Sequence, residues 1–212
     1  MAAWYLAEPP GLVPVPAAVA PEVQDRRVIL AEPPGAFRYD MRAVSEPYDD
    51  PPDGEYVDVV SEHDWYRSRL RGEPVPTSRY PVDHVWVEHR PDPPPARDAG
   101  GGATLVRPST GPADGSDATE STVFDRVVRL DEPPVRRPRR AQDVPDLTGR
   151  RIIVVQPAGP MPYWRAVSEP YLDRTNGDVS VTICSEHDWY RWAITREPPR
   201  AEPCPIYLVW VE

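Results

Sequence analysis

No lysine occurs in this chain of 212 residues, so all 24 of its basic residues are arginine. They stand against 34 acidic residues, which gives a formal net charge of −10 at pH 7. Nucleic acid phosphates and anionic membrane surfaces repel such a chain, so neither is an expected partner. Because Ala, Pro, Gly and Asp are abundant as well, we interpret the missing lysine as the coding bias of a GC-rich genome. Arginine content alone therefore carries no functional argument.

Long apolar runs are absent too. No stretch approaches the roughly 20 apolar residues that a membrane-spanning helix needs. Residues 1–10 contain no basic segment, and Glu8 and the prolines around it interrupt their apolar run, so we expect no secretory leader. Together these absences predict a cytoplasmic protein without a membrane partner.

The most informative feature that is present is an internal repeat. Arg42–Tyr48 returns unchanged as Arg165–Tyr171, and Ser61–Arg67 returns unchanged as Ser185–Arg191. Self-similarity of this kind indicates units that each form the same structure. We therefore predict two tandem modules, residues 1–88 and 123–212. The Pro-, Gly- and Ser-rich residues 89–122 between them are expected to be a flexible linker, because they have too little apolar surface to bury.

Each module is small, at roughly 85 residues, and a chain of this size buries little more than half of its unfolded surface. The modules should be marginally stable alone. Packing of one module against the other would remedy this, although nothing in the sequence shows that the modules touch.

The two cysteines, Cys184 and Cys204, both fall in the second module, where the first has Val60 and Tyr80. A residue that one copy does without is not the framework of the fold. We predict two ordinary buried thiols in a reducing compartment, with a disulfide or a reactive thiol as the alternative.

Short β-branched runs predict the strands. Arg27–Ala31 and Arg151–Val155 have the composition of buried strands, and each is stopped by a proline soon after. Tyr39–Glu46 with Tyr163–Glu169, and Val85–Glu88 with Tyr207–Glu212, are expected to be the next and the last strands.

A hairpin is predicted in between, because residues 49–54 and 172–177 end in Asp-Gly and Asn-Gly, which tolerate positive φ. Alternation in the strand that follows predicts which side chains face the core. The inward set is Val57, Val59, Val181 and Ile183, and the outward set is Tyr56, Asp58, Ser180 and Thr182.

Ser61 and Ser185 precede acidic residues and then an aromatic pair, which is typical of a helix N-cap. In the first module the helix should end near Gly72. The predicted class is α+β, with two tandem copies of a small, mostly antiparallel β module of four or five strands and one short helix each. If the residues around Leu6 form a strand, a five-stranded SH3-like barrel is the expected architecture.

Glu62-His63-Asp64 and its copy Glu186-His187-Asp188 are residue types that perform acid-base work and bind metals. Adjacent helical residues project in different directions, so one copy alone cannot converge three side chains on one point. His84 and His89 have no counterpart in the other module. A helix cap with solvated charge is therefore the favoured interpretation, and the same holds for Ser61 next to His63.

Two charged clusters have similar alternatives. The acidic tip Asp49, Asp50, Asp53 and Glu55 does not match the spacing of a calcium loop, so a hairpin turn is favoured. The basic run Arg136–Arg140 is matched by uncharged residues in the first module, so nucleic acid binding is not favoured. No glycine-rich phosphate loop or Cys-x-x-Cys pair occurs, and we predict neither cofactor nor metal.

The aromatic residues are 7 Trp and 10 Tyr but only 2 Phe, so most of the aromatic surface carries a polar group. Trp65, Tyr66 and Trp86 recur as Trp189, Tyr190 and Trp210, and Tyr39 and Tyr48 recur as well. One interpretation places these side chains in the core. The other places some of them on an exposed groove of the kind that partners recognise.

From these patterns we predict a non-enzymatic protein whose paired modules bind a protein or peptide, or each other. The alternative is an enzyme, perhaps a hydrolase, with a site in a cleft between the copies, and a third hypothesis is an accessory or structural protein of a mobile element or bacterial assembly. The candidate binding residues are Glu62, His63, Asp64, Trp65, Tyr66, Arg67, Trp86, Glu186, His187, Asp188, Trp189, Tyr190, Arg191 and Trp210.

Overall fold

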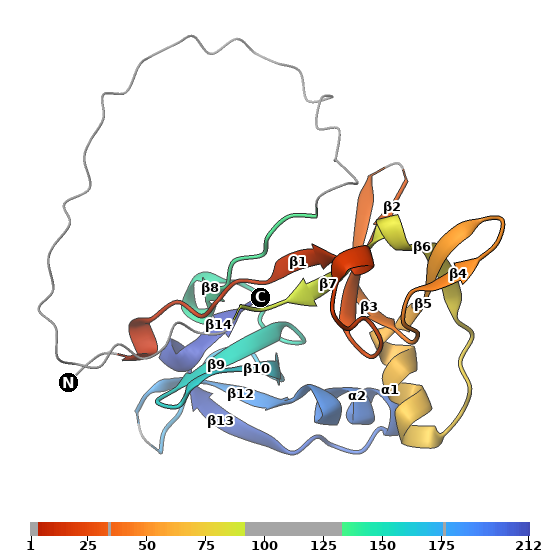
Figure 1. Cartoon of the computed structure of the whole chain (residues 1–212). Coiled ribbons are helices and arrows are strands. Elements are labelled where there is room, and N and C mark those ends of the chain that lie inside the picture. The colour runs from red at the N-terminus through yellow and green to blue at the C-terminus, as the bar shows by residue number, and fades with distance from the viewer. Residues whose placement is uncertain (1–3, 34, 92–132, 176) are drawn as a thin grey trace, which may run out of the picture.

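The structure is a computed structural model that describes residues 4–33, 35–91, 133–175 and 177–212. These residues form two modules of the same layout, each an antiparallel sheet of seven strands with one helix (Figure 1). The predicted α+β class with a duplicated sheet is confirmed. Most of the predicted linker, residues 92–122, lies outside the described residues, and His89 at its predicted start belongs to a strand.

Module 1, residues 4–91, has the strand order β1-β7-β2-β3-β5-β4, with β6 paired to β5. Its strands and helix are β1 (Val13–Pro16), β2 (Arg27–Glu32), β3 (Ala36–Ala43), β4 (Tyr48–Asp50), β5 (Gly54–Ser61), α1 (Glu62–Arg71), β6 (Ser78–Pro81) and β7 (Val85–His89). Short 3₁₀ helices are η1 (Trp4–Leu6), η2 (Ala17–Val19) and η3 (Val82–His84).

Module 2, residues 133–212, repeats this order as β8-β14-β9-β10-β12-β11, with β13 paired to β12. Its elements are β8 (Arg139–Arg140), η4 (Ala141–Asp143), β9 (Arg151–Gln156), β10 (Gly159–Ala166), β11 (Tyr171–Leu172), β12 (Val179–Ser185), α2 (Glu186–Thr195), β13 (Ala201–Pro205), η5 (Ile206–Leu208) and β14 (Val209–Val211).

The SH3-like barrel is wrong, because neither sheet closes on itself. The residues around Leu6 form the 3₁₀ helix η1 rather than a strand. The additional strands are the proline-containing segments β1, β6 and β13 and the short β4, β8 and β11. We had treated prolines as strand breakers, but a strand at a sheet margin tolerates a residue without an N–H group.

Each module has its own apolar core between the sheet and the segments that fold over it. The predicted inward set Val57, Val59, Val181 and Ile183 is buried in these cores. Of the predicted outward set, Ser180 is fully buried; it lies in β12, opposite Tyr171 of β11 and Pro205 of β13. This assignment was wrong, since alternation along one strand does not show what the flanking strands cover.

The helix starts are confirmed. The Ser61 side chain accepts a hydrogen bond from the Asp64 amide at 3.1 Å, and Ser185 does the same for Asp188 at 3.1 Å. The predicted end at Gly72 is also confirmed, with a left-handed φ of 68°. Within the described residues, no helix is long and apolar enough to cross a membrane.

The repeated Arg-Ala-Val-Ser-Glu-Pro-Tyr segment serves the turn before β2 or β9. The carboxylate of Glu46 accepts from the amides of Val23 and Gln24, both at 3.1 Å, and Glu169 binds the equivalent amides of module 2. Ser45 and Ser168 each accept one further strand amide at 3.0 Å. Much of this repeat is therefore conserved between the copies for local structure.

Cys184 and Cys204 are free and buried, as predicted. They lie at different positions along the paired strands β12 and β13, where Cys204 is opposite Val181 and Cys184 is opposite Ala201. Burial raises the pKa of both thiols to about 11. Neither thiol is therefore a reactive nucleophile at neutral pH.

Candidate functional site

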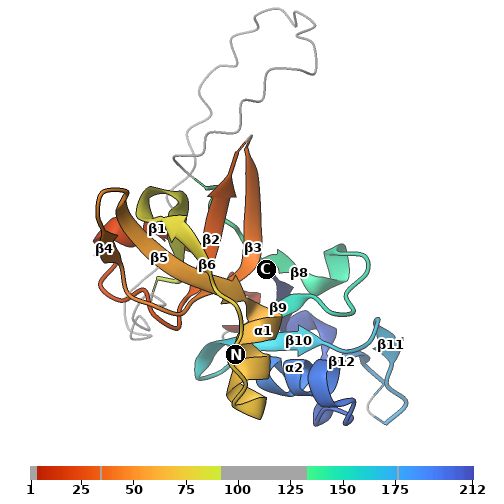
Figure 2. The same ribbon diagram turned by 90° about the vertical axis from the view of Figure 1, so that its right-hand side faces the viewer.

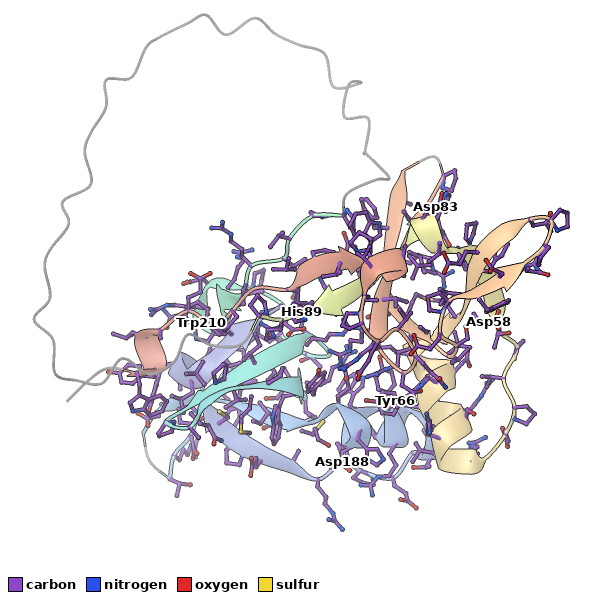
Figure 3. The ribbon with its side chains drawn as sticks, in the orientation of Figure 1. Asp58, Tyr66, Asp83, His89, Asp188 and Trp210 are labelled. Carbon is purple, nitrogen blue, oxygen red and sulfur yellow. The ribbon has the colours of Figure 1, made fainter. Side chains whose placement is uncertain are left out.

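Helices α1 and α2 lie against each other where the two modules meet (Figure 2). The ring of Tyr66, which is labelled in Figure 3, stacks at this point on that of Tyr190, with centroids 4.4 Å apart and an interplanar angle of 15°. At a second point Leu12 and Arg136 exchange backbone hydrogen bonds of 2.9 and 3.2 Å. We call this contact between the modules the seam. The two modules therefore pack on each other, which the sequence had left open.

Glu62, the first residue of α1, is fully buried in the seam. It is bound from its own module by Arg27, whose Nε lies 2.7 Å from Oε1. From module 2 it is bound by Arg151 at 2.6 Å and by the Tyr190 hydroxyl, which donates at 2.9 Å. A buried carboxylate needs such partners, because burying an unpaired charge costs several kcal/mol.

Glu186, at the start of α2, has the same position in module 2 and is 1% exposed. Arg27 of module 1 bonds to it directly, and Arg165 of its own module lies 3.3 Å away. The Tyr66 hydroxyl donates to it at 3.4 Å. Each helix start is therefore held by arginines from both modules and by a tyrosine hydroxyl from the other module.

The contacts around the two glutamates are reciprocal. Arg27 reaches Glu186 and Arg151 reaches Glu62, and both arginines begin equivalent strands. Arg151 also pairs with Asp40 at 2.8 Å, while Arg27 lies over the ring of Tyr163 at 4.8 Å. Met41 and Trp164 occupy equivalent positions in the two strand registers. The residues just before them, Asp40 and Tyr163, are therefore equivalent as well, and both lie where the register shifts. The counterpart of Tyr39 is thus Pro162, and its predicted recurrence as Tyr163 was wrong.

The electrostatics follow from this arrangement. Burial by itself would raise the pKa of Glu62, but Arg27, Arg151 and Arg42 lower it to about 2. Burial raises the pKa of Tyr66 and, with the adjacent Glu62 carboxylate, that of Tyr190. The carboxylate is therefore ionised and the phenols remain hydrogen-bond donors at neutral pH.

Two further arginines complete the cluster. Arg42 and Arg165 donate to the backbone carbonyls of Asp25 and Gly149 at 2.8 and 2.9 Å. Arg42 also lies 4.3 Å from the ring centroid of Trp65, which is a cation–π distance. The cluster thus contains four arginines around two glutamates, and burial lowers the pKa of Arg165.

A second set of ion pairs joins the two modules next to this cluster. Arg136 of module 2 bonds to Glu88 of module 1, and Arg90 of module 1 bonds to Glu212 of module 2. Glu88 and Glu212 are the final residues of equivalent copies and each is 3% exposed at the side chain. Burial raises the pKa of Glu88.

The seam is hollowed on one side. A cavity of about 410 Å³ is lined from module 1 by Arg27, Arg42 and Tyr66 and from module 2 by Tyr163 and His187, among others. It shares Asp25, Tyr66 and His187 with a more open cavity of about 550 Å³ that reaches Trp65 and Arg69. It also shares Arg26, Glu88, Arg90 and Tyr163 with a third cavity of about 410 Å³ that reaches Val87 and His89. We call these three adjoining cavities the seam groove.

The candidate binding residues divide into two groups. Glu62, Tyr66, Glu186 and Tyr190 meet in the seam, whereas His63 and His187 are exposed at its margin. His187 lines the groove and its ring lies 6.3 Å from that of Tyr66. His63 lines none of the three cavities that form the groove, so the two histidines do not share one.

Four more candidates act within their own helices. Arg67 pairs with Asp64 at 3.0 Å, and Arg191 pairs with Asp188 at 3.0 Å, in both cases three residues away. Together with the serine caps these contacts support a helix cap at the Ser-Glu-His-Asp segment. The expected solvated charge was wrong for Glu62 and Glu186, which are buried and paired with arginines. No group of three or more His, Cys, Asp or Glu side chains in the described part of the chain is arranged to hold a metal ion.

The repeated tryptophans have different surroundings. Trp65 donates to Asp25 at 3.0 Å and lines the groove, while Trp189 packs edge-on against Trp192. Trp86 is half-buried, and Trp210 is buried with Ile153 and Val155 (Figure 3). Trp210 therefore has the predicted core position, and Trp65 lines a cavity, whereas its recognition by a partner stays a prediction.

Arginines of both charged regions contact other residues of this chain. Arg79 bonds to Asp50 and lies 3.9 Å from Asp53, which ties the acidic hairpin tip to β6. In the basic run, Arg136 bonds to Glu88 and Arg140 lies over the ring of Trp210. The contacts of Arg79 agree with the hairpin turn that we favoured for the acidic tip.

The residues missed from the sequence are the four seam arginines, Arg27, Arg42, Arg151 and Arg165. We discounted arginine because of its abundance. A usable signal was present, since all four belong to segments that match between the copies and two of them begin apolar strands. An arginine at the start of a buried run requires a buried partner.

No family model, no curated protein and no solved structure matches this chain.

Proposed function

We propose that this chain is a non-enzymatic binding protein that takes a segment of a protein or peptide partner in the seam groove. The observation that supports it is the groove itself, because both modules contribute to its walls. Ligand sites favour such interfaces between domains. A role in stability alone would account for the seam but would give no use to the groove beside it.

The composition of the groove suits a peptide better than a small apolar ligand. Its walls carry both charge signs, including Arg26 and Arg69 as well as Asp25. Trp65 and Tyr163 add aromatic surface with a polar group, and Tyr163 is 57% exposed. Exposed Tyr, Trp and Arg are the residues that are enriched at binding hot spots. We therefore expect a peptide segment that carries both polar and apolar side chains.

Under this proposal the partner binds at the margin of the groove rather than at all of the candidate residues. Glu62, Tyr66, Glu186 and Tyr190 contact one another and the seam arginines, so their polar atoms are already engaged. A partner would therefore contact the groove margin, where His187, Trp65 and Tyr163 remain accessible. The paired glutamates would act as its support.

A selection from a displayed random peptide library, with the full chain as target, tests the proposal. We expect enriched peptides whose affinity falls at least about tenfold in Tyr163→Ala, as for a hot-spot residue. Tyr171→Ala is the matched control, because Tyr171 is also an exposed tyrosine but does not line the groove. Failure to enrich any peptide, or equal losses in both variants, would reject the groove as a peptide site.

A hydrolytic enzyme remains the second candidate, and one observation favours it. Ser185, Glu186 and His187 line the same cavity. However, the Ser185 hydroxyl is bonded to Asp188 and Glu186 is held by arginines, which leaves His187 alone for acid-base work. A hydrolase panel with His187→Ala, and with His63→Ala as the control outside the cavity, separates the candidates. Turnover that is lost only in His187→Ala would favour the enzyme.

A further inference from the structure

The contacts at the centre of the seam have the pattern of a two-fold axis. Leu12 pairs with Arg136 and Tyr66 stacks on Tyr190, and in each case the two residues occupy the same position of the two copies. In a two-fold symmetric dimer, a residue on the axis meets its own equivalent. The central contacts of the seam meet this condition.

The contacts away from the axis are reciprocal, as the same symmetry requires. Arg27 bonds to Glu186 while Arg151 bonds to Glu62. The Tyr66 hydroxyl donates to Glu186 while the Tyr190 hydroxyl donates to Glu62. Each module thus presents an arginine, a glutamate and a tyrosine that fit the same three groups on its neighbour.

From this we infer that the seam is a self-complementary dimerisation surface, so that each module can pair with the same module of a second copy of this chain. The partner of the seam is therefore any further copy of the module, and its sister in the same chain is one example. This inference does not depend on whether the groove binds a peptide.

The residues that differ between the modules allow this pairing. In a pair of two first modules, Glu88 takes the place of Glu212, so Arg90 keeps a carboxylate partner. Leu12 would then meet Leu12. In a pair of two second modules, Arg136 keeps Glu212 as a partner but lies opposite another Arg136 at the axis. The first module should therefore pair with itself more readily than the second.

In the intact chain the sister module has an advantage, because linkage raises its effective concentration into the millimolar range. Pairing between chains should become visible only when the covalent connection is removed. A protease site inserted within residues 92–132 achieves this and alters no described residue.

The experiment cleaves the full chain at that site, unfolds it in urea, refolds it by dilution and determines masses by native mass spectrometry. We expect three species: the mixed pair, the pair of first modules and, in smaller amount, the pair of second modules. Refolding of the uncleaved chain to a monomer is the control. Mixed pairs alone, folded single modules, or aggregated halves beside a cleanly refolded intact chain would overturn the inference.

Glu186→Gln sharpens the test, because it preserves shape and removes one buried charge from module 2. The pair of first modules keeps both of its glutamates, the mixed pair loses one and the pair of second modules loses both. We expect the ratio of first-module pairs to mixed pairs to rise at least about tenfold. Arg191→Ala, which removes only the helix-local pair with Asp188, should leave the ratio unchanged. An unchanged ratio in Glu186→Gln would contradict a shared charged surface.

Discussion

The equivalent tryptophans of the two modules, Trp65 and Trp189, contact different groups. In module 1, Trp65 donates to the Asp25 carboxylate, which also binds Arg69 at 2.7 Å. In module 2 the equivalent position is Gly149, and the Trp189 ring lies 3.5 Å from where a Cβ atom would be. Both residues have left-handed φ values, 63° and 83°. The backbone requirement is shared, whereas the contact with the tryptophan is polar in one module and a close steric approach in the other.

The helix surfaces diverge in the same way. The last turn of α1 carries Arg69 and Arg71, while α2 has no basic residue there. At the hairpin tip, exposed Leu172 and Val179 in module 2 replace acidic residues of module 1. The arginines, glutamates and tyrosines of the central seam cluster are matched between the modules, whereas these outer residues are not. This difference indicates that the contact between the modules constrains the sequence more strongly than the outer surface does.

The largest expected effect comes from breaking the matched part. Glu62→Ala and Glu186→Ala should each reduce the free energy of unfolding by about 3–5 kcal/mol, because each leaves buried arginines without their carboxylate. Urea unfolding measures this. Glu22→Ala, which removes an exposed pair with Arg26, is the control and should not shift the midpoint measurably. A large loss for one glutamate only would show that the seam is not symmetric in energy.

The pH dependence isolates Glu62. Its folded pKa of about 2 lies below the ordinary 4.5, so the unfolded state binds more protons between these values. The contribution is fully present above pH 4.5 and is lost as pH falls toward 2, by about 3 kcal/mol in total. Unfolding free energies of Glu62→Gln should therefore decline less over this range than those of the parent. Parallel declines would show that Glu62 is not held by the arginines.

The support beneath the tryptophan is the next point of comparison. Asp25→Gly converts module 1 to the arrangement of module 2 and removes the bonds to Trp65 and Arg69. Glycine adopts the left-handed backbone conformation without strain, which offsets part of this loss. We therefore expect a net destabilisation of about 1 kcal/mol in thermal unfolding. A variant at least as stable as the parent would show that the polar contact contributes nothing beyond shape.

The smallest effect concerns the helix ends. Arg196 closes α2 with a φ of 68°, the conformation that Gly72 adopts after α1. Arg196→Gly should raise the free energy of unfolding by about 0.5–1 kcal/mol, because glycine adopts this conformation without a steric cost. Gly72→Arg should lower the free energy of unfolding by a similar amount. Only the backbone conformation contributes to this cost, because no atom lies within 4 Å of an added Cβ. Equal stability of all three proteins would contradict this account.

Local features of the fold were predictable from neighbouring residues. The Ser61 and Ser185 caps, the end at Gly72 and the inward valines of β5 each depend on a few adjacent positions. The proline-containing strands β1, β6 and β13 were missed, because their place at the sheet margin depends on distant partners. The buried Ser180 was missed for the same reason.

The candidate site was predictable only in part. The repeat identified Glu62, Tyr66 and their copies as important, and it indicated two equal modules. It did not identify their partners, since Arg27 is 159 positions from Glu186 and Arg151 is 89 positions from Glu62. Such pairs leave no local pattern.

By itself the sequence determined that there are two copies, where each helix begins and which side chains of the central strands are apolar, because caps, turns and alternation act over a few residues. Only the tertiary structure decided that the helix starts of the two copies share one buried charge cluster. The reason is that a buried carboxylate is stabilised by whichever cations the fold brings within about 3 Å, and chain separation does not enter that distance.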